Sequence, residues 1–171
     1  MMGSNPSIDV GDSMPVSYVS WALCNAFIIK LNQITGKNFR MPTEAEWEFA
    51  ARGGNKSHHY KYSGSDNIDE VGWHVYNSNW APKNVALKAP NELGIYDMTG
   101  NVEECCQDWY GRYESQPQTN PTGPETGQYR VARGGAWGYN EILCTVTGRS
   151  RCATTTKDSN LGLRLVLDFN Q

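Results

Sequence analysis

The stretch TGKNFRMPTEAEWEFAARGG, residues 35–54, carries the start and stop signals of a helix. Thr43 and Glu46 have the spacing of a capping box, in which each side chain accepts a hydrogen bond from the backbone N–H of the other residue. The acidic first turn also suits the positive end of the helix dipole. The glycine pair at 53–54 cannot continue the helix favourably. The stretch therefore predicts a short helix between Thr43 and Gly53.

A second helix is predicted upstream, over residues 21–34, WALCNAFIIKLNQI. Ser20 can cap its first turn, and Gly36 ends it. Apolar residues recur along it at helical spacing and predict one buried stripe. The stripe comprises Trp21, Cys24, Phe27, Ile28 and Leu31.

After residue 55, short strand-like runs alternate with turns, and no long helix is evident. The runs are GIYDM (94–98), YRVARGG (129–135), ILCTVT (142–147) and GLRLVLDF (162–169). The 17 glycines and eight prolines also favour many turns. We therefore expect an α+β fold with two helices, short antiparallel strands and many loops.

Composition narrows the classes of partner. The chain has 171 residues, enough for one domain with a sizeable core, and a net charge of −3 with no long basic run. These features argue against nucleic acid and anionic membranes as partners. No apolar run reaches the length of a membrane span, and the first residues do not resemble a signal peptide. The compartment and the oligomeric state stay open.

The cysteines favour free thiols over a disulfide framework or a zinc site. Their number, five, is odd, and no two are spaced as CxxC. They are Cys24, Cys105, Cys106, Cys144 and Cys152.

Several segments together resemble the formylglycine-generating-enzyme or sulfatase-modifying-factor domain, a variant of the C-type lectin fold. The similar segments, which span nearly the whole chain, are PVSYVSW (15–21), residues 35–54, APNELGIYDMTGNVEECCQDWYG (89–111), NPTGP (120–124), YRVARGGAW (129–137) and NLGLRLVL (160–167). The resemblance implies a single domain over residues 15–171 after a flexible segment, 1–14. It also implies that the family's earlier strands are missing, because MGSNPS (2–7) resembles an internal segment.

Enzymes of this family use two cysteines, five residues apart after the glycine pair, to bind copper(I) and form formylglycine in sulfatases. The second cysteine position falls on Cys144, but the first falls on Tyr139. A phenol is a hard ligand with a pKa near 10, so it does not replace a thiolate on copper(I). Copper is therefore not expected, and Cys144 is predicted to be a small buried strand residue. The alternative is a divergent oxidase that works through Cys144.

The resemblance further implies a structural calcium site in DMTGNVEE (97–104). Calcium prefers several hard oxygen ligands, which side chains and backbone carbonyls supply together. The matching positions are Asp97, Gly100, Val102 and Glu104. The alternative is that Asp97 caps a turn and Glu104 pairs with a buried arginine such as Arg133 or Arg164. Glu103 and Cys105 depart from the family, which commonly has aromatic residues there.

The segment between RGGAW (133–137) and LGLRL (161–165) is predicted to be an exposed ligand-binding loop on a non-catalytic module. It resembles the C-terminal segment that is rewritten in variable proteins of diversity-generating retroelements. The implied partner is a protein or a cell-surface ligand, at a bacterial or phage surface. The alternative is an ordinary solvent loop. The predicted ligand-binding residues are Trp137, Gly138, Tyr139, Asn140, Ile142, Thr147, Gly148, Ser150, Arg151, Cys152, Ala153, Thr155, Thr156, Asp158 and Ser159.

Overall fold

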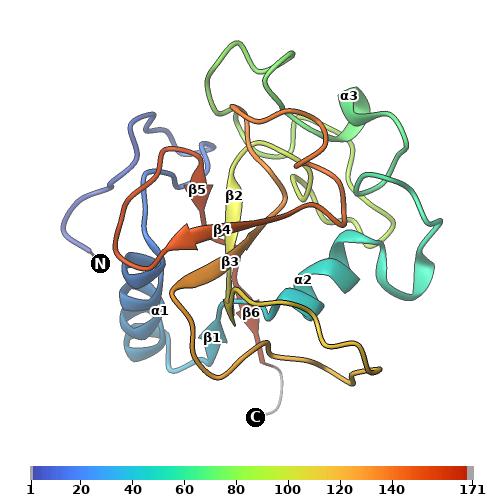
Figure 1. Ribbon diagram of the computed structural model, residues 1–171. Coiled ribbons are helices and arrows are strands. Elements are labelled where there is room, and N and C mark those ends of the chain that lie inside the picture. Colours follow the sequence, from blue (N-terminus) through green and yellow to red (C-terminus); the bar gives the residue numbers. More distant parts are fainter. Residues whose placement is uncertain (1, 169–171) are drawn as a thin grey trace.

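The helices lie in the first half of the chain, and all strands except the short β1 lie in the second half. The computed structural model describes residues 2–168, so residue 1 and residues 169–171 of the predicted domain lie outside the described residues. The elements are α1 (Trp21–Thr35), β1 (Phe39–Arg40), α2 (Glu44–Ala51), a 3-10 turn (Gly54–Lys56), α3 (Ile68–Val71), β2 (Glu103–Trp109), β3 (Tyr129–Arg133), β4 (Arg149–Ala153), β5 (Leu161–Gly162) and β6 (Val166–Leu167) (Figure 1).

Both predicted helices are confirmed, with the predicted caps. Ser20 Oγ accepts a hydrogen bond from the Leu23 N–H at 3.3 Å at the start of α1. Gly36 ends α1 with a φ of 67°, in the left-handed region that glycine adopts without strain. At α2, Thr43 Oγ1 accepts from the Glu46 N–H at 3.2 Å, and the Glu46 carboxylate accepts from the Thr43 N–H at 2.9 Å.

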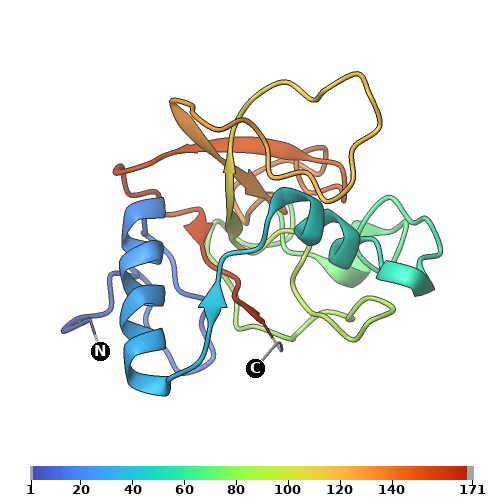
Figure 2. The same ribbon diagram turned by 90° about the horizontal axis from the view of Figure 1, so that it is seen from below.

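The main sheet has the strand order β4–β3–β2–β5, and β1 pairs with β6 separately. Strands β2, β3 and β4 are antiparallel, whereas β5 runs parallel to β2. Helices α1 and α2 lie on either side of β2 and β3 in both views (Figures 1 and 2). Successive side chains of a strand point to opposite faces, so β2 presents Cys105 to α1 and Cys106 to α2.

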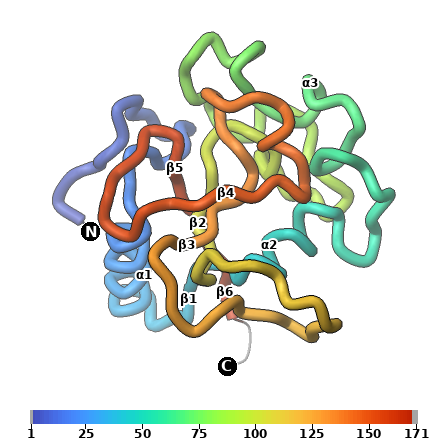
Figure 3. Tube along the Cα trace, in the orientation of Figure 1, coloured from blue at the N-terminus to red at the C-terminus, as the bar shows by residue number. Residues whose placement is uncertain are grey.

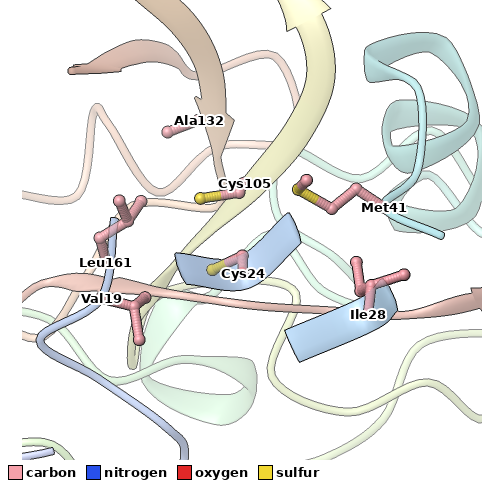
Figure 4. Packing of buried hydrophobic residues seen from close by; sticks show 7 residues of the cluster. All are labelled: Val19, Cys24, Ile28, Met41, Cys105, Ala132 and Leu161. Atoms are coloured by element: carbon pink, nitrogen blue, oxygen red, sulfur yellow. The ribbon is translucent and has the colours of Figure 1, made fainter. Parts of the chain in front are cut away.

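The buried layer between α1 and the sheet is built from small and medium side chains. Figure 4 shows Cys24 of α1 below Cys105 of β2, with both sulfur atoms turned to the side of Leu161, and Met41 on the other side. Ala132 of β3 leaves room above Cys105, and Cys152 of β4 packs against the same layer from the far side. The α2 side has its own cluster around Trp47, which is 1% exposed.

Two of the predicted strands are wrong. Residues 94–98 form an irregular loop instead, and residues 142–147 form turns. In the first run, Gly94 and Asp97 have φ values of 78° and 58°, which bend the backbone away from an extended path. In the second run, Cys144 is buried as predicted, but it lies in a turn. Its backbone N–H donates a hydrogen bond to the Glu141 carbonyl at 3.2 Å. Cys144 is therefore not a strand residue.

The remaining strand predictions are partly confirmed. The run 129–135 contains β3, and the run 162–169 overlaps β5 and contains β6, although Phe169 lies outside the described residues. Strand β2 was not predicted. Strand β4 lies within the segment 138–160, where residues 149–153 were predicted to be loop, so that prediction is corrected for these residues.

The N-terminal segment contacts the domain at Ser7 and at Ser13, whose carbonyl accepts a hydrogen bond from the Val85 N–H at 2.8 Å. Ser7 is buried, and its hydroxyl accepts a hydrogen bond from the Ser17 N–H at 3.0 Å. The flexibility of residues 1–14 stays a prediction. Within residues 2–168, no helix combines the length and the apolar character needed to cross a bilayer.

Candidate functional site

The segment 136–160 crosses one side of the molecule next to the loop that follows α3. Figure 3 shows its orange-to-red trace beside the green trace of that loop. The Val75 N–H donates to the Tyr139 carbonyl at 3.0 Å, and Ser78 Oγ donates to the Trp137 carbonyl at 2.9 Å. The Trp137 N–H in turn donates to the Asn101 carbonyl at 2.8 Å. These bonds hold the two loops together as one surface.

The predicted ligand-binding residues divide into two groups by exposure. The exposed residues are Asn140, Ile142, Thr147, Arg151, Thr155, Thr156 and Asp158. The partly buried residues are Trp137, Gly138, Tyr139, Gly148, Ser150, Cys152, Ala153 and Ser159. Ile142 is 70% exposed, the most of any apolar side chain in the segment. The structure thus brings only the first group to the surface as accessible contact residues.

Strand β4 explains part of this division. Its side chains alternate, so Ser150 and Cys152 turn toward the α1 side of the sheet. Arg149 turns toward the α2 side, where its guanidinium binds Glu44 at 2.7 Å. Arg151 is exposed, and its guanidinium lies 4.7 Å from the centre of the Tyr129 ring. Arg151 is therefore the strand residue best placed to meet a ligand.

A buried carboxylic acid, Glu103, lies beneath the segment. Its side chain accepts a hydrogen bond from Ser150 Oγ and is 5% exposed. Burial raises the pKa of Glu103 to about 7, while hydrogen bonds from Ser150 and Tyr139 oppose the rise and the nearby Asp158 adds to it. Burial likewise raises the pKa of Tyr139 well above its ordinary value. The surface thus rests on an acid that titrates near neutral pH.

Cys144 lies beneath the surface as a neutral thiol. It is 0% exposed, and burial raises the pKa of its thiol to about 12. Its Sγ donates to the Asn140 carbonyl at 3.5 Å. Gly135 permits this packing, because a Cβ atom there would come within 2.5 Å of the sulfur. A thiol in this state is a weak nucleophile, since nucleophilic attack needs the thiolate.

The two side chains of the predicted calcium site, Asp97 and Glu104, are already bound by protein groups. The Glu104 carboxylate binds the Arg164 guanidinium at 2.7 Å and the Trp47 indole N–H at 2.6 Å. Asp97 accepts a hydrogen bond from the Ala86 N–H at 2.7 Å, and burial raises its pKa. A calcium ion at Glu104 would have to displace the positive charge of Arg164. Calcium binding at these residues stays a prediction.

Sequence reasoning missed Glu103 and the loop around Val75 and Ser78 as parts of this surface. A signal for Glu103 was present, because a carboxylic acid stands there in place of an aromatic residue. The two loop residues carried no such signal, since their contacts to the segment use a backbone N–H and one hydroxyl.

Comparison with known proteins identifies the family. The model of the sulfatase-modifying factor enzyme 1-like domain matches residues 1–169. Chaperone protein LppX of Paenibacillus barcinonensis is 37% identical over 97% of this chain and 74% of that protein. The formylglycine-generating enzyme of Streptomyces coelicolor is 33% identical over 97% of this chain and 56% of that enzyme.

A solved structure agrees with this assignment. Treponema denticola variable protein 1 is similar with a TM-score of 0.83 and 32% identity, over 96% of this chain and 77% of that chain. The chain spans about half the length of the formylglycine-generating enzymes that it matches. The α+β architecture is the formylglycine-generating-enzyme type of C-type lectin fold, and the chain belongs to the sulfatase-modifying factor enzyme 1-like domain family.

Proposed function

We propose that this chain is a non-catalytic ligand-binding module. Its binding face consists of the exposed residues of the segment 138–160 together with the adjoining loop 74–80. The ligand is a protein or another component of a cell surface. The likeness to Treponema denticola variable protein 1 supports this proposal.

The observation that carries the proposal is the state of the former catalytic position. Tyr139 occupies the place of the first cysteine, and the thiol of Cys144 is buried with its pKa raised to about 12. The exposed side chains above it, such as Ile142 and Arg151, provide apolar and cationic contacts instead. A large apolar side chain and an arginine are residue types that contribute strongly at protein interfaces.

A binding assay on cells tests the face. Fluorescently labelled protein is added to intact cells of the source strain and of its neighbours, and binding is followed by flow cytometry. Ile142→Asp and Arg151→Glu should each abolish most binding, whereas Lys30→Glu on exposed α1 should leave it unchanged. Equal binding by all variants that remain folded would contradict the proposed face.

We also propose that the segment 138–160 differs between copies of this protein. The test is genomic: a reverse transcriptase gene should lie beside the coding sequence, with a near-copy of the region for residues 130–165 that differs at adenines. If neither is present, diversification is wrong, although ligand binding is unaffected.

The oxidase alternative has a separate test. The protein is incubated with copper(I) and a cysteine-containing sulfatase peptide, and the product is analysed for an aldehyde by mass spectrometry. No aldehyde is expected, because Tyr139 and neutral Cys144 do not provide two thiolates. An aldehyde that disappears in Cys144→Ala would overturn the non-catalytic proposal.

A further inference from the structure

A cavity of about 780 Å³ lies on the α2 side of the sheet, between α2 and the loop of residues 111–124. The loop, yellow to orange, runs beside α2 in both ribbon views (Figures 1 and 2). Glu48 and Phe49 of α2 form one wall with Arg52, which follows α2, and Asp108 of β2 forms part of the floor. A volume of this size is typical of sites for small molecules. The proposed binding face does not include this cavity.

The floor of the cavity is a set of hydrogen-bonded polar groups. The Arg149 guanidinium donates two hydrogen bonds to the Glu44 carboxylate, at 2.7 and 2.8 Å. Tyr113 Oη donates to the same carboxylate at 2.8 Å, and Asp108 accepts from the Glu44 N–H at 2.8 Å. Glu44 and Asp108 are 6% and 4% exposed. Their positions are therefore fixed before any ligand arrives.

The walls combine aromatic rings with neutral polar side chains. Phe49 and Tyr113 are 56% and 67% exposed, so each ring has a free surface beside the cavity. The loop supplies amides and hydroxyls, which both donate and accept hydrogen bonds. These are Gln116, Gln118, Thr119, Asn120 and Thr122.

The charges at the cavity nearly cancel, because three arginines face four carboxylates. They are Arg52, Arg112, Arg149, Glu44, Glu48, Asp108 and Glu114. A strongly charged ligand therefore gains little here. Among the described residues that line the cavity there is no Leu, Ile, Val or Met, so an apolar peptide side chain has no pocket to fill.

We propose that this cavity binds a short, uncharged oligosaccharide. Each sugar hydroxyl both donates and accepts a hydrogen bond, which matches the carboxylates, guanidinium groups and amides of the lining. The C–H faces of sugar rings pack against aromatic rings, the role assigned to Phe49 and Tyr113. Binding at this cavity needs neither calcium nor the exposed residues of the segment 138–160 that form the proposed face, so it is independent of the proposed function.

The test uses a panel of neutral trisaccharides built from glucose, mannose, galactose or N-acetylglucosamine, with EDTA present. Saturation-transfer NMR identifies the sugars that bind, and calorimetry measures their dissociation constants. At least one sugar should bind, and Phe49→Ala or Tyr113→Ala should weaken it by about tenfold. Because both side chains are exposed, these variants should stay folded, which circular dichroism verifies.

Two controls separate this cavity from the proposed face and from a charged ligand. Ile142→Ala on the proposed face should leave sugar binding unchanged. A large increase in salt concentration should alter the dissociation constant little, because salt screens charge–charge interactions and an uncharged sugar makes none. Failure of every sugar in the panel to bind would overturn the proposal. So would sugar binding that Ile142→Ala abolishes and the Phe49 and Tyr113 variants do not affect.

Discussion

Arg164 Nη2 donates to Glu104 Oε1 at 2.7 Å, so one arginine occupies the carboxylate that the predicted calcium site requires. Calcium and guanidinium therefore compete for Glu104. We expect calcium to raise the thermal midpoint of Arg164→Gln by about 3 °C or more and to change that of the unaltered protein little. Scanning fluorimetry measures both. The rise should be lost in the double variant that also carries Asp97→Asn. If calcium does not raise the thermal midpoint of Arg164→Gln, the predicted calcium site is wrong.

Glu103 should make the stability of the fold depend on pH. Burial raises its pKa from 4.5 to about 7, so the folded state holds a proton that the unfolded chain releases over this range. The stability contributed by the protonated acid is fully present below pH 4.5 and is lost as the pH rises through 7. From the size of the shift, the loss amounts to about 3 kcal/mol.

The substitution Glu103→Gln should abolish this loss. Urea unfolding at pH 5 and pH 8 measures the difference, and the variant should lose less stability between the two values than the unaltered protein does. Glu114→Gln, at an exposed loop position, is the matched control and should behave as the unaltered protein. An unchanged pH dependence in Glu103→Gln would mean that this acid does not titrate near neutral pH.

Cys152 should be the first thiol to react with iodoacetamide in the folded protein. It is partly exposed, and its contact with the Cys105 thiol lowers its pKa. The other cysteines are at most 2% exposed. Intact-mass spectrometry should show one adduct that Cys152→Ser removes. Equally fast modification of Cys144 would contradict the buried, neutral state assigned to it.

Gly100 should tolerate no side chain, whereas Gly94 should tolerate alanine. Both have positive φ, 69° and 78°. A Cβ atom on Gly100 would overlap the Trp73 carbonyl, but one on Gly94 would meet no atom within 4 Å. Gly94→Ala should cost about 1 kcal/mol and Gly100→Ala about 3 kcal/mol or more. Chemical unfolding measures both values. Equal costs for the two variants would contradict the close approach of Gly100 to the Trp73 carbonyl.

Local sequence signals were sufficient for the helices and insufficient for two strands. The caps of α1 and α2 depend on residues within four positions of one another, so a short window reveals them. Strand β2, EECCQDW, has no apolar alternation because both of its faces are buried. Its buried carboxylates bind partners that are distant in sequence. Glu104, for example, binds Arg164, 60 positions further along the chain.

The segment 138–160 was delimited from its framing motifs, but the strand within it was not predicted. The sequence RSRCA of β4 alternates basic residues with small ones and carries no large aliphatic side chain. It is a strand because its backbone pairs with β3 over five residues. That pairing links positions separated by a long loop, so no local pattern could indicate it.

The alternation along β4 limits how freely evolution can rewrite this segment. A change at Ser150 or Cys152 must fit a packed layer, and a change at Arg149 leaves Glu44 without its partner. A change at Arg151 meets only solvent and the rings of Tyr110 and Tyr129. The repertoire of surfaces that such a segment can present is therefore set by its turns and by few positions of its strand, and it is smaller than the length of the segment implies.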